Sequence, residues 1–129
     1  MLMANGKVFR DILRVNGFRK SVRIATKGIV YLFLYHRNMR LIFVAGLLTF
    51  ILGLTFKLSA IELVALCVTI TLVFMAEIFN TAIELMMNAI TEKYHTKVKL
   101  VKDIAAAVVI LTILNSMVVG YILFVRKLF

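Results

Sequence analysis

Long uncharged apolar stretches dominate the pattern of this chain. Residues 41–56 and 104–125 carry no charged side chain, as is typical of membrane-spanning helices. The first stretch covers only about 24 Å at 1.5 Å per residue, short of the ~30 Å hydrocarbon core. Because residues 28–35 are also apolar, we expect that helix to begin earlier. We predict three transmembrane helices, over about 36–56, 60–91 and 103–125.

Two local signals set the expected helix starts. Ser59-Ala60-Ile61-Glu62 is a capping box ahead of an apolar run, so the second helix should begin there. Asp103 stands at the expected start of the third helix, where a carboxylate suits the positive end of the helix dipole. Between these helices we expect a tight reversal at Phe56–Ser59 and a basic connector over Glu92–Lys102.

In the N-terminal region before residue 28, apolar residues alternate with basic ones and do not form a continuous run. Apolar residues recur at steps of three and four through residues 7–35, with basic residues between them. This pattern predicts a basic amphipathic helix that lies on the membrane surface and runs into the first transmembrane helix. Asn16-Gly17 is a turn signal that we expect to divide it. The fold class is therefore all-α integral membrane, with one membrane domain over residues 1–129.

Composition supports this class. Of the 129 residues, 63% are hydrophobic and 17% charged, and the mean hydropathy is +1.01. A water-soluble domain of this size carries more charge, so a soluble enzyme is disfavoured. The lone cysteine excludes an internal disulfide.

The basic residues have a clear sidedness. Residues 1–40 and 92–102 hold 13 of the 16 lysines and arginines. The positive-inside rule then places the N-terminus and the 92–102 segment in the cytoplasm and the C-terminus outside. Because these cations flank apolar spans, we expect membrane lipids and anionic phosphate as partners rather than nucleic acid.

One polar stripe interrupts the second helix. At 100° per residue, Glu84 lies about 20° from Glu77, and Asn80 and Asn88 fall within about 60° of it. Ionisable groups inside a membrane helix are costly and need a polar environment. The stripe fits either a polar seam that joins helices or a metal–phosphate site, since carboxylate oxygen suits Mg²⁺.

These residues resemble a known family. Glu77-x-x-Asn80-Thr81-Ala82-Ile83-Glu84, Tyr94-His95 and Lys102-Asp103-Ile104-Ala105-Ala106-Ala107 are similar to the motifs of the small prokaryotic diacylglycerol kinases. Phe18-x-x-Ser21-x-x-x-Ala25-x-x-Gly28-Ile29 and Arg37-Asn38-Met39 look more like the Gram-positive undecaprenol kinase branch. The similarity runs from about Phe18 to the end of the chain.

The resemblance implies a homotrimer that uses ATP and Mg²⁺ to phosphorylate a lipid alcohol, undecaprenol first and diacylglycerol second. Glu77 would be the general base, Asn80 would orient it or the substrate, and Glu84 would bind the metal. The implied nucleotide contacts are Tyr94, His95, Lys102, Asp103 and Gly28. Phosphoryl transfer relies mainly on positioning and charge neutralisation. A base, a metal ligand and a few nucleotide contacts are the groups that this reaction needs.

The chain also departs from the family pattern. His36 stands where the family has a second metal-binding Glu, and Asn88 where it usually has Asp. Ile42 replaces a family His, and Ala107 or Val108 replaces a Gly. His36 would be a poor ligand for Mg²⁺, which prefers oxygen. Two alternatives stay open: a catalytically weakened paralogue that acts as a lipid-binding or regulatory subunit, and a small channel or transporter subunit.

Overall fold

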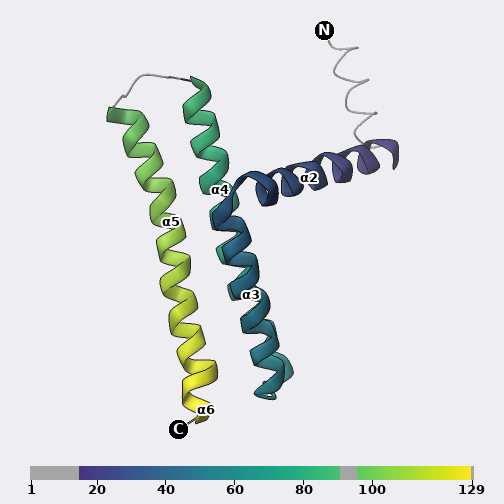
Figure 1. Cartoon of the computed structure of the whole chain (residues 1–129), viewed down its shortest axis with the longest axis vertical. Coiled ribbons are helices and arrows are strands. Elements are labelled where there is room, and N and C mark those ends of the chain that lie inside the picture. Colours follow the sequence, from purple (N-terminus) through teal and green to yellow (C-terminus); the bar gives the residue numbers. More distant parts are fainter. Residues whose placement is uncertain (1–14, 91–95, 129) are drawn as a thin grey trace. The chain divides into compact units, whose positions relative to one another are not determined.

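The computed structural model describes residues 15–90 and 96–128, almost all of them helical. Figure 1 shows the helices in chain order. They are α2 (Val15–Tyr35), α3 (Arg37–Thr55), α4 (Ala60–Ile90) and α5 (Thr96–Gly120), which continues through the π-helical η1 (Tyr121–Val125) into α6 (Arg126–Leu128). The chain divides into two units, one ending at Arg37 and the other beginning at Asn38.

The first unit consists, in its described part, of α2. On this helix Phe18, Val22 and Ile29 are exposed and lie within about 40° of one another at 100° per residue. Lys20, Arg23 and Lys27 fall about 120–180° from the middle of this group, and Arg19 lies about 80° from it. The described helix is therefore amphipathic, and Asn16-Gly17 lies in its first turn. The predicted residues 7–14 lie outside the described part of the chain.

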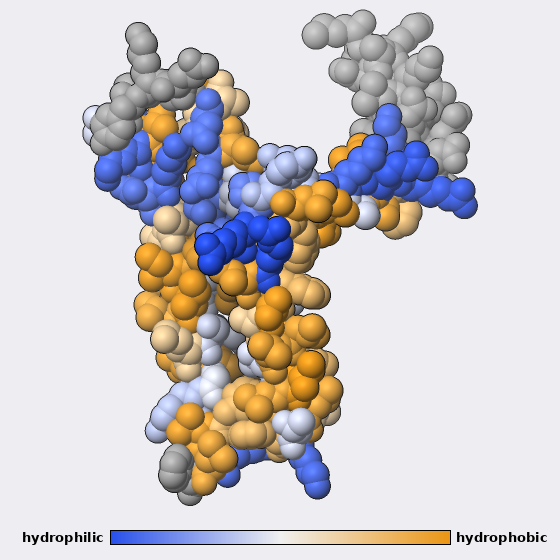
Figure 2. All heavy atoms as spheres, viewed as in Figure 1, coloured by the Kyte–Doolittle hydropathy of each residue, from blue (hydrophilic) through white to orange (hydrophobic). Residues whose placement is uncertain are grey.

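The second unit contains the membrane-spanning segments. Three helical segments are long and apolar enough to cross a bilayer: Arg37–Thr55, Ala60–Ile90 and Thr96–Leu128. Figure 2 shows hydrophobic residues covering the length of these helices, with hydrophilic residues at their ends. This confirms an all-helical protein with three helices suited to a membrane.

The predicted start of the third helix at Asp103 is wrong. α5 begins at Thr96, so Asp103 lies beyond its first turn and most of the expected connector is helical. Residues 96–102 contain neither Gly nor Pro, and the Lys99 ammonium lies 2.8 Å from the Asp103 carboxylate one turn on. Opposite charges at this spacing support a helix, which explains why it extends through the basic segment.

The turn between α3 and α4 is a Schellman motif. Leu58 N–H donates to the Gly53 carbonyl and Lys57 N–H donates to the Leu54 carbonyl, both at 3.2 Å. Lys57 supplies the left-handed residue of this motif, with φ of 54°. A Cβ at Gly53 would lie 2.9 Å from the Leu66 side chain. The absence of a side chain at Gly53 thus allows the turn to pack tightly against α4.

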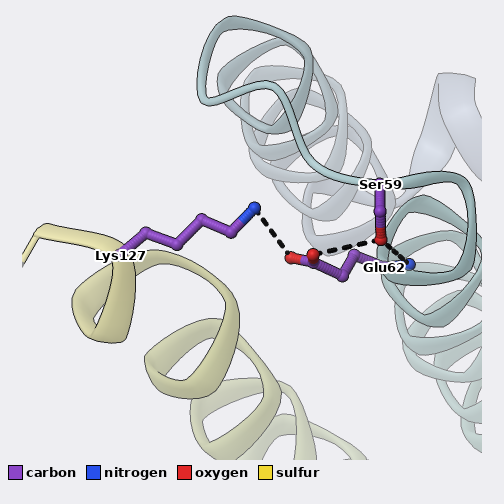
Figure 3. A network of polar contacts seen from close by, with 3 residues as sticks. All are labelled: Ser59, Glu62 and Lys127. Carbon is purple, nitrogen blue, oxygen red and sulfur yellow. Dashed lines mark hydrogen bonds and ion pairs between the residues drawn. The ribbon is translucent and has the colours of Figure 1, made fainter.

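The expected capping box at the start of α4 is confirmed. Glu62 N–H donates to the Ser59 hydroxyl at 3.3 Å, and that hydroxyl donates to the Glu62 carboxylate at 3.0 Å. Figure 3 shows this pair together with Lys127, whose ammonium lies 3.1 Å from the same carboxylate. One carboxylate therefore serves both the helix cap and a link to the C-terminal end of the chain.

A small hydrophobic core lies beside this network. Leu58, Leu66, Leu123 and Phe124 are buried together, and the Phe56 and Phe124 rings meet edge to face at 5.3 Å. We call this region the Ser59 end of the α4–α5 pair. At the opposite end, which we call the Asn88 end, the Lys102 ammonium donates to the Asn88 side-chain oxygen. Contacts at both ends show that α4 and α5 run antiparallel.

Candidate active site

The predicted stripe begins in the interior of α4. Glu77 and Thr81 are buried, with 6% and 2% of their surfaces exposed. One turn after Glu77, the Asn80 side-chain oxygen is buried and accepts no hydrogen bond from the described residues. A buried polar atom without a partner costs about 1–3 kcal/mol, and a bound molecule or a second chain that donates to it recovers this cost. The buried part of the stripe therefore has an oxygen available for a ligand.

The stripe continues towards the Asn88 end. Glu84 and Asn88 are both exposed, so the side chains pass from buried to accessible along one side of the helix. The region contains neither Gly nor Pro, and the unbroken α4 fixes the spacing between the carboxylates. Along this side of the helix, exposed Glu84 lies about two turns after buried Glu77, and exposed Asn88 about three turns after it.

Helix α5 brings its own charged groups to this end. Lys102, half-buried, donates from its ammonium to the Asn88 side-chain oxygen at 2.8 Å. Asp103, the next residue, is bound by Lys99 instead, and both side chains are more than half exposed. Ala105, one turn after Lys102, is buried, so the small residues of this segment let α5 pack closely. The structure thus brings Lys102 to the end of the stripe.

The other predicted residues fall into two groups. Tyr94 and His95 lie outside the described residues. Gly28 and His36 belong to the unit that ends at Arg37, and Gly28 is exposed with open space around its Cα.

The described residues offer few protein ligands for a metal ion. Within residues 15–90 and 96–128, no three His, Cys, Asp or Glu side chains are grouped so as to hold a metal ion. The stripe nevertheless offers oxygen donors: the carboxylates of Glu77 and Glu84 and the unpartnered Asn80 oxygen. Oxygen donors of this kind, few in number and completed by substrate phosphates, are the usual environment of Mg²⁺. These residues therefore supply part of an oxygen ligand set for Mg²⁺, which further oxygen atoms would have to complete.

Two features of this region were missed from the sequence. Thr81 is among the most buried side chains, although as a lone hydroxyl within the motif it gave no signal of its own. The Asn88–Lys102 contact joins residues 14 positions apart on two helices. It could be found only from the antiparallel pairing, since helix periodicity relates residues of one helix alone.

Comparisons with known proteins agree with these motifs. The family model described as prokaryotic diacylglycerol kinase matches residues 23–124. An undecaprenol kinase of Bacillus subtilis is 34% identical over 114 residues, covering 88% of this chain and 93% of its own length. A diacylglycerol kinase of Synechocystis is 33% identical over 101 residues, which covers 78% of this chain and 58% of that protein.

Proposed function

Because this chain belongs to the prokaryotic diacylglycerol kinase family, a family of membrane lipid kinases, we propose that it transfers the γ-phosphoryl group of ATP to a membrane lipid alcohol. Undecaprenol is the first choice of acceptor, because the relative that this chain covers almost in full is an undecaprenol kinase. Diacylglycerol is the second choice.

The observation that carries the proposal is the polar side of α4. Glu77 is buried, the Asn80 oxygen is buried without a partner, and Glu84 is exposed one turn further on. A seam that only joins the helices of one copy would have its buried polar atoms bonded to one another. A stripe with an unpartnered oxygen between two carboxylates supports a binding site for substrate instead.

In the proposed mechanism the residues of α4 act on the lipid hydroxyl. Glu77 accepts the hydroxyl proton as the hydroxyl oxygen forms its bond to the γ-phosphorus, and the bond to the ADP oxygen breaks. Asn80 orients the base or the lipid substrate, and its side-chain oxygen can accept a hydrogen bond from a donor other than the reacting hydroxyl. Glu84, with phosphate oxygens of ATP, would hold Mg²⁺, which supplies charge neutralisation when bound.

The remaining carried-over residues would hold the nucleotide. Lys102 offers a positive charge to the phosphates at the end of the stripe, and the family motif adds Tyr94, His95, Asp103 and Gly28 as nucleotide contacts. His36 would not contribute a ligand, because Mg²⁺ binds a neutral nitrogen poorly. The set is enough to position the nucleotide and neutralise its charge, the main demands of phosphoryl transfer.

The proposal also includes the setting of the site. The basic residues before residue 40 and within 92–102 support a cytoplasmic active site, with α2 on the inner membrane surface and the C-terminus outside. Within the chain, only 11%, 28% and 11% of the three spanning windows are buried. The exposed sides of these helices leave apolar surface for other copies or for lipid, and the homotrimer itself is what the family resemblance implies.

A radiolabelled phosphate-transfer assay tests the proposal. Full-length protein in mixed micelles would receive γ-labelled MgATP and either undecaprenol, diacylglycerol or a short-chain alcohol as control. We expect labelled lipid phosphate with one of the two lipids, and Glu84→Gln should raise the Mg²⁺ concentration for half-maximal rate. Native mass spectrometry of the same sample should give three copies.

The rival is a lipid-binding subunit without catalysis. It has support in this chain because His36 and Asn88 replace acidic residues of the family pattern. Wild-type protein that binds either lipid but transfers no label with Mg²⁺ or Mn²⁺ would establish the rival and remove the kinase proposal.

A further inference from the structure

One polar residue of α5 lies in the middle of an apolar span and takes no part in the proposed mechanism. Asn115 stands near the centre of the uncharged run 104–125, about 15 Å from either end at 1.5 Å per residue. Its side chain is exposed on the surface of the chain. A side chain this short cannot reach water at either membrane surface, so a group within the hydrocarbon must satisfy its amide.

The other polar side chains near Asn115 bond within their own helix. The Thr112 hydroxyl donates to the Val109 carbonyl at 2.8 Å, and the Ser116 hydroxyl donates to the Ile113 carbonyl at 2.6 Å. A hydroxyl has one donor, which such a bond uses. The Asn115 amide has two N–H donors and an acceptor oxygen, and the backbone N–H groups within a helix are already paired. The amide therefore needs a partner from outside α5.

Asn115 belongs to a regular outward side of α5, which we call the Asn115 face. Apolar residues recur on this face at alternating steps of three and four, around one central amide. The face consists of Val101, Ile104, Val108, Leu111, Asn115 and Val118. Its apolar members are 36–65% exposed, and its middle lies about 90° around the helix from buried Ala105. This spacing is typical of the seam along which two or more helices pack in parallel.

We propose that the Asn115 face is an interface between copies of this chain, in which the Asn115 amides of neighbouring copies donate hydrogen bonds to one another. The charge bias orients every copy alike in the membrane, so Asn115 comes to the same depth in each of them. An amide both donates and accepts, and it therefore complements a second amide. A helix of another protein would need its own polar group at that depth.

The membrane environment favours such a contact. Lipid chains are as apolar as valine and leucine, so apolar side chains alone give a helix little preference for another helix over lipid. A hydrogen bond between helices meets no competing donor or acceptor in the hydrocarbon. In a heptad, Asn115 takes an a position, where a single Asn specifies the register and the number of helices. The family resemblance implies three copies, and the Asn115 face assigns the surface that joins them.

Disulfide cross-linking of the full-length protein in membranes tests the interface. The background variant is Cys67→Ala, which removes the cysteine of the chain. Leu111→Cys then places a cysteine on the Asn115 face, and Ile110→Cys is the matched control. The two positions are neighbours at one depth, 65% and 58% exposed, on different sides of α5. We expect Leu111→Cys to form disulfide-linked dimers at least roughly five-fold faster, because a disulfide needs Cα atoms within about 7 Å.

A second measurement tests the amide itself. In the Leu111→Cys background, Asn115→Leu keeps the size of the side chain and removes its hydrogen bonds. We expect cross-linking to slow by roughly three-fold or more, and Asn115→Gln, which retains an amide, to slow it less. Circular dichroism of the same samples should give equal helical content and equal melting temperatures, so a slower rate reports association of copies rather than folding.

Four results would overturn the inference. Equal rates for Leu111→Cys and Ile110→Cys, or a faster rate for Ile110→Cys, would place the contact between copies on another surface. No disulfide-linked dimer from either variant would mean that lipid or a different protein covers the Asn115 face. An unchanged rate in Asn115→Leu would remove the hydrogen bond between amides. None of these results depends on phosphate transfer, so this inference and the kinase proposal can fail separately.

Discussion

The two ends of the α4–α5 pair use similar polar residues in opposite ways. At the Ser59 end, the carboxylate of Glu62 is bound by both Ser59 and Lys127, beside a buried core of leucine and phenylalanine. Towards the Asn88 end, Asn80 keeps a buried oxygen without a partner and Lys102 is held by an amide. At the Ser59 end the polar groups bond to one another within the chain. Towards the Asn88 end, some polar groups stay available to bind a ligand.

The comparison separates residues that serve stability from residues that serve binding. Satisfied polar groups next to a packed core stabilise a structure, so changes at the Ser59 end should affect unfolding. Buried polar groups without a hydrogen-bond partner lower the stability of a protein, and they occur mostly where function requires them. Changes along the stripe should therefore affect catalysis and leave folding intact or improved.

The largest expected effect is on catalysis at Asn80. Asn80→Leu has a similar size and removes the unpartnered oxygen, so kcat should fall by roughly 10²-fold or more because the base or the substrate is no longer oriented. Thermal stability should stay equal or rise, since a buried unsatisfied group has been replaced by an apolar one. The same sample would be measured for phosphate transfer and for unfolding by circular dichroism; loss of both properties together would contradict a functional role.

The next effect concerns packing at the Ser59 end. Gly53→Val places atoms against Leu66 and Leu58, which a Cβ alone would already meet at 2.9 and 3.1 Å. Overpacking of this kind should lower the free energy of unfolding by about 1–3 kcal/mol, with KM for MgATP unchanged. Gly120→Val is the control, because the space around Gly120 is open. Equal losses in the two variants, measured by denaturant titration in micelles, would contradict the packing role of Gly53.

A smaller effect is expected at the cap of α4. Ser59→Ala removes the hydroxyl that accepts from Glu62 N–H and donates to its carboxylate. Loss of a helix N-cap costs about 0.5–2 kcal/mol, and kcat should not change. Lys127→Met should cost less than Ser59→Ala, because an ion pair with partly exposed side chains contributes about 0–1 kcal/mol. A larger loss of thermal stability in Lys127→Met than in Ser59→Ala would mean that the ion pair stabilises this end more than the helix cap does.

The smallest effect has the opposite sign. Lys57 occupies the left-handed region with φ of 54°, where glycine has no Cβ penalty. Lys57→Gly should therefore raise the free energy of unfolding by up to about 1 kcal/mol, while Lys57→Val should lower it. A destabilised Lys57→Gly variant in the same unfolding assay would show that the lysine side chain makes a contribution larger than this strain.

Much of the fold could be predicted from local signals. The Ser59-Glu62 box and the uncharged runs each act within one helix, and the structure has a capped α4 and three helices suited to a membrane. The start of α5 was predicted wrongly because charge was taken as the end of a helix, whereas Lys99 and Asp103 support one another within it.

The candidate site was predictable only in part. Helix periodicity placed Glu77, Asn80 and Glu84 on one side of α4. This placement could be predicted because it depends only on the geometry of a single helix. The partner of Lys102 depends on how two helices pair, and burial of Glu77 and Thr81 depends on packing across the unit. The spacing of residues in the sequence carries no information about either.

The most direct test of the account compares wild type with Glu77→Gln in the labelled-ATP assay on undecaprenol and diacylglycerol. The two side chains are nearly isosteric, so both proteins should give the same helical content and the same melting temperature within a few degrees. We expect wild type to form lipid phosphate and Glu77→Gln to lose about 10²–10⁴-fold in kcat, because the amide cannot accept the hydroxyl proton. Equal rates for the two folded proteins would contradict the central claim that the buried carboxylate of α4 is the catalytic base.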